Sequence, residues 1–215
     1  PRWDLINMKK YAMMDIQYSR GCPFDCDFCD ITNMFGQKVR TKTTAQFVAE
    51  LEDMYQQGWR GDVFIVDDNF IGNTHALKTS LLPAMQNWMQ KRKRPFSFGA
   101  EVSVNLADDD ELLQKMVQAG FDTVFVGIET PNEKSLKECS KRQNQDRDML
   151  ASVKKMQRAG LMVHGGFIVG FDHDSPSIFE QQIDFICRSG IITAMVGLLN
   201  APKGTRLYQR IVKEG

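Results

Sequence analysis

The sequence predicts an α/β fold in which parallel strands form an open, partial (βα)6 barrel of the TIM type. Six short apolar runs alternate with longer segments of helical periodicity, and this alternation indicates parallel strands joined by right-handed crossovers. Six units are too few to close the eight-stranded barrel, which takes ~250 residues. A doubly wound sheet is the alternative, because periodicity alone does not distinguish the two folds.

The expected strands are short apolar runs that end in polar or small residues, a pattern typical of buried strands. They are expected at 16–20, 63–66, 96–102, 123–128, 162–169 and 193–199.

Helices are expected between the strands, where apolar residues recur at spacings of three and four. Helical periodicity starts at Thr44 and stops at Gly58, and a last helical segment covers 205–212. Three further helices end in glycine directly before a strand, and glycine is a common helix stop. Their repeated strings are Gln-Ala-Gly-Phe at 118–121, Arg-Ala-Gly-Leu at 158–161 and Arg-Ser-Gly-Ile at 188–191.

Three of the helix starts carry residues that are preferred as N-caps. The caps are expected at Thr74, Asp108 and Ser175, and Pro176 follows at the first helical position.

The composition is that of a globular domain, with 42% hydrophobic and 25% charged residues among 215. Basic and acidic residues number 27 each, so no net charge attracts nucleic acid, which is not an expected partner. No apolar run approaches the ~20 residues of a membrane-spanning helix, and no signal peptide opens the chain. We therefore expect a cytoplasmic location and a single domain over 1–215, which we interpret as a segment of a longer protein.

Three cysteines, Cys22, Cys26 and Cys29, form a C-x3-C-x2-C array within eight residues. Closely spaced cysteine thiolates hold iron-sulfur clusters. Three protein ligands on a four-iron cluster leave one iron open to a substrate or cofactor, as an open position does in catalytic zinc sites.

Three other interpretations of these cysteines compete. A structural zinc site usually has two pairs of ligands, and no second pair with suitable spacing follows. A redox pair of Cys26 and Cys29 leaves Cys22 unexplained. Incidental placement is disfavoured by the neighbouring Gly21, Pro23 and Phe28.

The candidate site lies at the carboxyl ends of the expected strands, where ligands bind in parallel α/β folds. Beyond the cysteine loop, the polar and small residues at these ends are Asp67, Asp68, Asn69, Glu101, Ser103, Gly127, Glu129, Thr130, Gly166, Ile168, Gly170, Leu199, Asn200 and Ala201. Aspartates also form turns, glutamates cap helices and glycines allow close packing, so each residue has a structural alternative.

The string Ser-Arg-Gly-Cys-Pro-Phe-Asp-Cys-Asp-Phe-Cys at 19–29 resembles the signature of the radical S-adenosylmethionine (radical SAM) superfamily. It is similar to the branch whose members often carry an N-terminal cobalamin-binding domain, and the resemblance extends from about Ile16 to Tyr208. It implies a partial barrel with a [4Fe-4S] cluster on Cys22, Cys26 and Cys29, and S-adenosylmethionine at the open iron. Reductive cleavage would give a 5'-deoxyadenosyl radical that abstracts hydrogen from a substrate, with a flavodoxin- or ferredoxin-type protein as one-electron reductant.

The resemblance also assigns residues to the methionine and ribose parts of S-adenosylmethionine. Asp67, Asp68 and Asn69 stand where the family has a Gly-Gly-Glu motif for the methionine amino group, which is a departure in sequence that keeps the hydrogen-bond acceptors. Glu129, in Gly-Ile-Glu-Thr, matches the ribose-contacting end of the fourth strand. Glu101 ends the third strand and is a further acceptor.

The adenine site is implied by the fifth and sixth strands. The string from Gly166 through Ile168 to Gly170 matches the family's Gly-x-Ile-x-Gly motif, although Asp172 and His173 stand near its usual trailing Glu. The main chain of Phe28 would meet the adenine edge. Residues expected to line the ring are Leu199, Asn200 and Ala201.

Four further residues have weaker assignments. Arg40, Lys141 and Arg142 are candidates for the methionine carboxylate. His164 is interpreted as a core residue, because a single histidine does not make a ligand set.

The resemblance favours methylation, or a related modification, of an unactivated carbon in a small-molecule or lipid-like substrate. A cobalamin-dependent methyltransferase would bind cobalamin in a domain outside this segment. The alternatives are a methylthiotransferase-like enzyme that modifies RNA and a non-catalytic iron-sulfur electron-transfer domain. A fourth cysteine at the cluster would favour the last of these.

Overall fold

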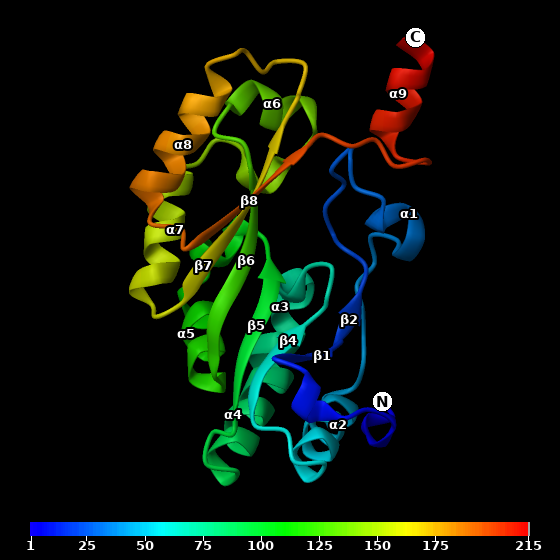
Figure 1. The fold of residues 1–215 in the computed structure, drawn as a ribbon, viewed down its shortest axis with the longest axis vertical. Helices are drawn as coiled ribbons and strands as arrows, with labels where there is room; N and C mark the ends of the chain where they lie inside the picture. The colour runs from blue at the N-terminus through cyan, green and yellow to red at the C-terminus, as the bar shows by residue number, and fades with distance from the viewer. Residues whose placement is uncertain (215) are drawn as a thin grey trace.

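The computed structural model describes residues 1–214, and its centre is a six-stranded parallel sheet with the strand order β1-β4-β5-β6-β7-β8. Every strand pairs with its neighbour in sequence order in this sheet, so the winding does not reverse as it does in a doubly wound fold. The strands are β1 (Met13–Ile16), β4 (Gly61–Ile65), β5 (Phe96–Val102), β6 (Phe121–Glu129), β7 (Met162–Val169) and β8 (Thr193–Leu198). The sheet is curled and open (Figure 1), which confirms the predicted partial barrel.

Helices cover the outer face of the curled sheet, and the core lies between the two layers. Fully buried side chains come from both layers, for example Phe47 and Leu51 of α2 against Val63 and Ile65 of β4. The main covering helices are α2 (Thr44–Gln56), α4 (Leu82–Lys91), α5 (Asp110–Ala119), α7 (Met149–Arg158) and α8 (Ile178–Ser189). Alternate side chains of the strands are left to face the inside of the barrel.

Shorter elements complete the chain. The helix α3 (Thr74–Ala76) continues through one π-helical turn, η4 (Leu77–Leu81), into α4. Two short helices, α1 (Ile31–Phe35) and α6 (Glu133–Glu138), were not predicted. The remaining elements are the 3-10 helices η1 (Trp3–Leu5), η2 (Met8–Lys10), η3 (Phe70–Asn73), η5 (Val104–Asp108) and η6 (Arg142–Asn144), the strands β2 (Ser19–Arg20) and β3 (Arg40–Thr41), and the helix α9 (Arg206–Glu214).

The first predicted strand, 16–20, is wrong in its position. The parallel strand β1 ends at Ile16, and the later residues Ser19–Arg20 pair antiparallel with β3. The backbone N–H groups of Tyr18 and Ser19 donate to the carboxylate of Asp67, at 2.7 and 2.8 Å. These two N–H groups therefore bond to a side chain and not to a neighbouring strand of the sheet. The chain leaves the parallel sheet after Ile16.

The predicted helix caps are each displaced by one or two residues. Asn73, not Thr74, accepts the backbone N–H of Ala76, and Asp109, not Asp108, accepts that of Leu112. Asp108 belongs to η5 and pairs with Arg147 instead.

The helix predicted to start at Ser175 starts later. Its N-cap is Ser177, because the Ser175 carbonyl first closes a turn with the N–H of Ile178 at 2.8 Å.

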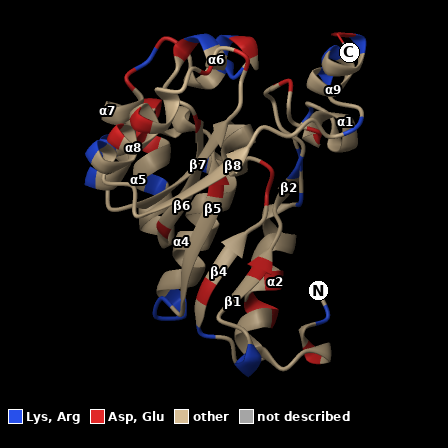
Figure 2. Cartoon of the chain, turned by 45° about the horizontal axis from the view of Figure 1, so that its top comes forward, with Lys and Arg blue, Asp and Glu red and all other residues tan. Residues whose placement is uncertain are grey.

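Charged side chains are distributed unevenly over the fold. Basic residues gather in the loop after α4, and acidic residues lie on α2 and near α6, with one each in β4 and β5 (Figure 2). None of the helices in residues 1–214 is long and apolar enough to cross a membrane.

Candidate active site

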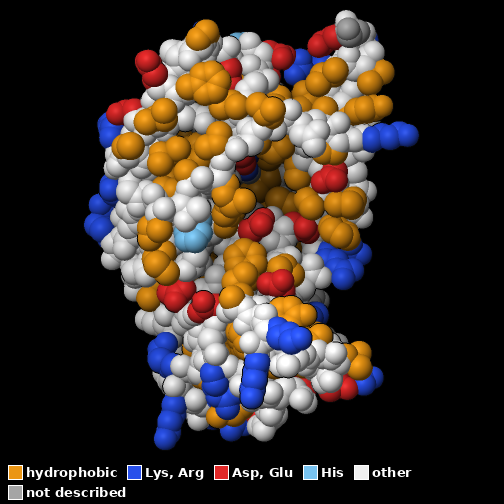
Figure 3. Space-filling view, in the orientation of Figure 1, with side chains coloured by type: hydrophobic (Ala, Val, Ile, Leu, Met, Phe, Trp, Pro, Cys, Tyr) orange, Lys and Arg blue, Asp and Glu red, His pale blue; other side chains and the backbone are white. Residues whose placement is uncertain are grey.

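A cavity of about 550 Å³ lies inside the curled sheet, beside the carboxyl ends of the strands and the cysteine loop. The space-filling view shows a hollow bordered by apolar and acidic side chains (Figure 3). The predicted site residues that line it are Cys22, Cys26, Phe28, Cys29, Asp67, Asp68, Asn69, Glu101, Ser103, Gly127, Glu129, Gly166 and Ile168. Residues from five separate segments are thus brought to one space.

Five candidate residues do not line this cavity: Thr130, Gly170, Leu199, Asn200 and Ala201. They lie one to three positions beyond the ends of β6, β7 and β8, outside the cavity wall. Met195, inside β8, lines the cavity instead.

The cysteine loop is held by backbone contacts at both ends. Gly21 has a φ of +95°, and a Cβ at this position would lie 2.8 Å from the carbonyl oxygen of Gly36, so the turn requires glycine. The N–H of Gly21 donates to Asp68 at 2.8 Å. At the other end, the N–H of Asp27 donates to the carbonyl of Cys139 at 3.0 Å. The loop therefore presents its thiols from a fixed backbone.

Burial raises the pKa of all three loop thiols, and it raises the pKa of Cys29 to about 11. The charge of Cys26 further raises the pKa of Cys22 and Cys29, and that of Cys22 raises the pKa of Cys29. Lys141 opposes this rise. At neutral pH the three thiols are therefore protonated, and metal binding must release their protons.

The donor set fits an iron-sulfur cluster. No group of three or more His, Cys, Asp and Glu side chains within residues 1–214 is arranged to hold a single metal ion, whereas the three thiols border a large cavity together. Cys139 is buried outside the cavity lining, and its Sγ lies 3.6 Å from the carbonyl oxygen of Leu136. Within residues 1–214 the cavity wall therefore presents three cysteines, which would hold a four-iron cluster and leave its fourth position for another ligand.

Cluster assembly is expected to be favoured at alkaline pH. Because each raised pKa keeps a thiol protonated, binding releases protons, and the iron bound per chain should be higher at about pH 9 than at about pH 7. Anaerobic reconstitution at matched iron and sulfide, followed by iron analysis, measures this. Circular dichroism at both pH values controls for unfolding, and equal or lower iron at the higher pH would contradict the expectation.

Asp67 and Asp68 are engaged by the chain itself. Besides the backbone donors of Tyr18 and Ser19, the carboxylate of Asp67 accepts the Ser19 hydroxyl at 2.5 Å. Burial raises the pKa of Asp67, and these hydrogen bonds oppose the rise. Asp67 thus holds β2 to the end of β4, so its oxygens are committed to the fold.

Asn69 reaches the cavity from the same strand end. Its side chain exchanges hydrogen bonds with Ser103, at 3.1 Å to the hydroxyl and 3.2 Å from the backbone N–H. Asn69 therefore connects the ends of β4 and β5 and lines the cavity together with the cysteine loop.

A buried ion pair forms the opposite wall. Lys141 Nζ lies 2.5 Å from Glu129 Oε1, and the two side chains are 12% and 9% exposed. Glu129 has a φ of +63° beside a bulge in β6. Burial alone would lower the pKa of Lys141, but Glu129 and Cys26 raise it above its ordinary value. Lys141 is therefore a charged group inside the cavity.

The three candidate basic residues differ in their positions. Only Lys141 lines the cavity, whereas Arg40 donates to the carbonyl of Phe35 at 3.0 Å on the outside of the loop. Arg142 is exposed on η6. His164 does not line the cavity.

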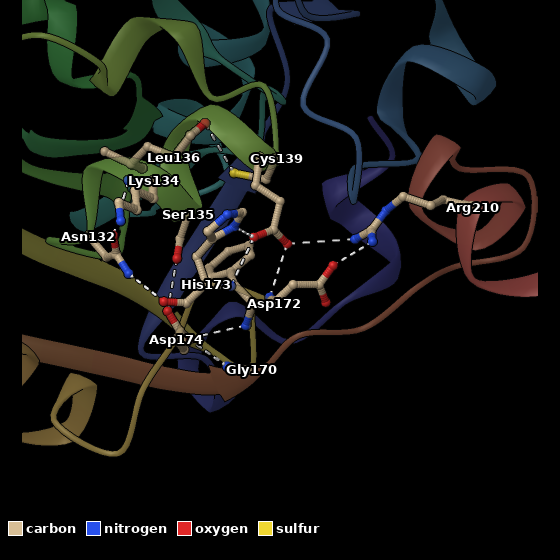
Figure 4. A network of polar contacts seen from close by, with 12 residues as sticks. Asn132, Lys134, Ser135, Leu136, Cys139, Gly170, Asp172, His173, Asp174 and Arg210 are labelled. Carbon is tan, nitrogen blue, oxygen red and sulfur yellow. Dashed lines mark hydrogen bonds and ion pairs between the residues drawn. The ribbon is translucent and has the colours of Figure 1, made fainter. Parts of the chain in front are cut away.

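The loop after β7 turns away from the cavity. The carboxylate of Glu138 accepts the N–H groups of Asp172 and His173, at 3.1 and 3.2 Å. Arg210 of α9 pairs with Asp172 at 2.5 Å (Figure 4). Asp172 and His173, which stand near the position of the trailing Glu in the family's Gly-x-Ile-x-Gly motif, therefore connect α6 with α9 and do not point into the cavity.

The chain matches the Radical SAM superfamily model over residues 16–186. It belongs to the radical SAM superfamily. This radical SAM domain is 44% identical over 214 residues to an uncharacterized methyltransferase, sll1242, of a Synechocystis strain, covering 100% of this chain and 40% of that protein. It is 39% identical over 215 residues to a hopanoid C-2 methylase of Rhodopseudomonas palustris, covering 100% and 41%. The chain thus spans about two fifths of the length of these relatives.

Solved structures share the fold of this radical SAM domain. The radical S-adenosylmethionine methyltransferase TsrM from Kitasatospora setae, with cobalamin and a [4Fe-4S] cluster bound, superposes with a TM-score of 0.83 at 18% identity, covering 97% of this chain and 39% of that one. The cobalamin-dependent radical enzyme OxsB superposes with a TM-score of 0.66 at 18% identity, covering 93% and 30%. The superfamily implies a [4Fe-4S] cluster and S-adenosylmethionine as cofactors.

The sequence analysis missed the apolar residues of the cavity wall, such as Phe125 and Met195, and one polar residue. Gln143 lines the wall beside Cys26, although nothing in its sequence context distinguishes it from an exposed glutamine.

Proposed function

We propose that this chain is the core of a cobalamin-dependent methyltransferase that modifies an unactivated carbon of a small-molecule or lipid-like substrate. The observation that carries the proposal is the presence of three thiols and several acceptor side chains around one cavity. The relatives support methyl transfer, since one is named for hopanoid C-2 methylation at 39% identity. Cobalamin would be held by a domain outside residues 1–215, and the electron would come from a flavodoxin- or ferredoxin-type protein.

Cys22, Cys26 and Cys29 would hold the cluster. When bound, the cluster and S-adenosylmethionine together supply the one-electron cleavage that starts radical chemistry. The residues of this chain bind and orient, and they exclude water from the reacting atoms.

Acceptors in the cavity wall would bind the cofactor's ammonium and ribose hydroxyl groups. We assign this role to Asn69, Glu101 and Glu129, because carboxylate and amide oxygens accept from such donors. Burial, and then the charge of Asp68, raises the pKa of Glu101, so a nearby ammonium would stabilise its charged form.

Because Gly166 has no side chain, it would leave room for the adenine ring beside β7. A Cβ at Gly166 would lie 3.0 Å from the ring of Phe125, so a larger residue would push that ring into the cavity. Phe28 lines the same cavity, and its main chain would meet the adenine edge.

Two other functions have less support. A putative methylthiotransferase of Methanocaldococcus jannaschii is 23% identical, but the equal numbers of acidic and basic residues do not favour RNA. An electron-transfer domain would be favoured by a fourth cysteine at the cavity, and the cysteines that line it are Cys22, Cys26 and Cys29.

Electron paramagnetic resonance of the reconstituted, reduced protein tests the proposal. We expect a four-iron signal that changes shape when S-adenosylmethionine is added, because an open iron takes up the cofactor. Mass spectrometry should then detect 5'-deoxyadenosine after reduction. A four-iron signal that is indifferent to S-adenosylmethionine would contradict the proposal and favour an electron carrier.

A further inference from the structure

Gln143 places a buried amide against one of the three loop thiols. Its Nε2 lies 3.7 Å from Cys26 Sγ, a hydrogen-bond distance for a sulfur acceptor. The side chain is 9% exposed and lines the cavity. Gln143 therefore donates to the sulfur of one of the three proposed cluster ligands.

The 3-10 helix η6 that carries Gln143 is fixed to the sheet. The neighbouring Asn144 is fully buried, and its Nδ2 donates to the carbonyl oxygens of Gly127 and Ile128, at 2.9 and 3.0 Å. Just before η6, the ion pair of Lys141 with Glu129 makes a second link to the end of β6. The position of the Gln143 side chain is thus set by the backbone of η6, which these contacts fix to the end of β6.

The other amide atom of Gln143 has no partner. Oε1 is buried and accepts no hydrogen bond from any residue in the described part of the chain. Buried polar atoms are rarely left unpaired, and such exceptions call for an explanation. Within residues 1–214 the side-chain amide of Gln143 is therefore engaged through Nε2, and the acceptor is the sulfur of Cys26.

We propose that Gln143 is a positioning residue that donates a hydrogen bond to the sulfur of Cys26 and makes the cluster easier to reduce. Hydrogen bonds to cluster sulfurs set reduction potential, because they stabilise the more negative, reduced state. The inference rests on the proposed cluster ligation by Cys22, Cys26 and Cys29. Lys141 is also positive, but its charge is compensated by Glu129 at 2.5 Å, which leaves the amide as the specific donor.

The test is a redox titration of the reconstituted protein and of Gln143→Leu, which removes the donor and keeps the bulk. At a fixed solution potential, we expect the ratio of reduced to oxidised cluster to fall about tenfold, which corresponds to about 59 mV for a one-electron couple. Gln145→Leu is the matched control, because Gln145 donates its amide to the carbonyl of Leu136, at 2.9 Å, rather than to a thiol. Gln145→Leu should titrate like the unsubstituted protein.

A loaded Gln143→Leu cluster that titrates like the control would overturn the inference while leaving the cluster site intact. Absence of a cluster in the unsubstituted protein would instead overturn the proposed function. Should Gln143→Leu fail to hold iron, the unsubstituted protein still decides the question. With glutamine labelled by ¹⁵N in its side-chain amide, we expect a nitrogen coupling to the reduced cluster, and its absence would also overturn the inference.

Discussion

The Cys26→Ala protein is expected to fold and to retain almost no iron after reconstitution. Cys26 is the most buried of the three loop thiols, at 8% exposed, and its loss leaves two protein ligands for the cluster. Its side chain is small, and the loop backbone is held by Asp68 and by the carbonyl of Cys139 rather than by the thiol. Iron and sulfide per chain measure the loss, and far-UV circular dichroism measures the fold.

Cys187→Ala is the matched control for that experiment. Cys187 is an exposed thiol on α8 and does not line the cavity, so its removal should leave the iron content unchanged. Full iron in Cys26→Ala would refute the ligand assignment. Loss of iron in both variants would show that the procedure, rather than the site, is sensitive to cysteine substitution.

Lys141→Met is expected to destabilise the apoprotein by about 3 kcal/mol, because it leaves the carboxylate of Glu129 buried without its partner. The two charges lie 2.5 Å apart and both side chains are nearly buried. We take the lower end of the range for broken buried pairs, since the pair borders the cavity. Urea unfolding of the iron-free protein measures the free energy change.

The double variant Lys141→Met with Glu129→Gln is expected to recover part of the lost stability, since it removes both charges. Lys137→Met is the matched control, because Lys137 is exposed and, within residues 1–214, pairs with the exposed carboxylates of Glu133 and Asp146, and surface pairs contribute little. Equal stabilities of Lys141→Met and Lys137→Met would contradict a structural role for the buried pair.

The sequence alone was enough to predict that strands alternate with helices and that the strands run parallel, whereas the strand order that excludes a doubly wound sheet came from the structure. Apolar runs such as 162–169 alternate with helical periods, and this pattern has few topological solutions when crossovers are right-handed. The cysteine array at 22–29 was equally informative, because closely spaced thiols have few physical uses. Signals of this kind are contained in the order of neighbouring residues, so they need no knowledge of distant contacts.

The tertiary structure decided what the strand-end residues contact. Asp67 looks like a cofactor ligand in the sequence, yet three hydrogen-bond donors of Tyr18 and Ser19 use its oxygens. The same contacts displace the first strand from its predicted position. A carboxylate at a strand end can bind a ligand or its own chain, and the choice depends on donors that lie 48 and 49 positions away in sequence.

The composition of the cavity wall was likewise decided by the fold. Leu199 and Ala201 follow a strand end as the other candidates do, but they lie beyond the cavity, and Met195 takes a place in its wall. Gln143 has no distinguishing sequence pattern and becomes a cavity residue because η6 is tied to the end of β6. Local sequence determines which chemistry a side chain carries, whereas its neighbours are set by how distant segments pack.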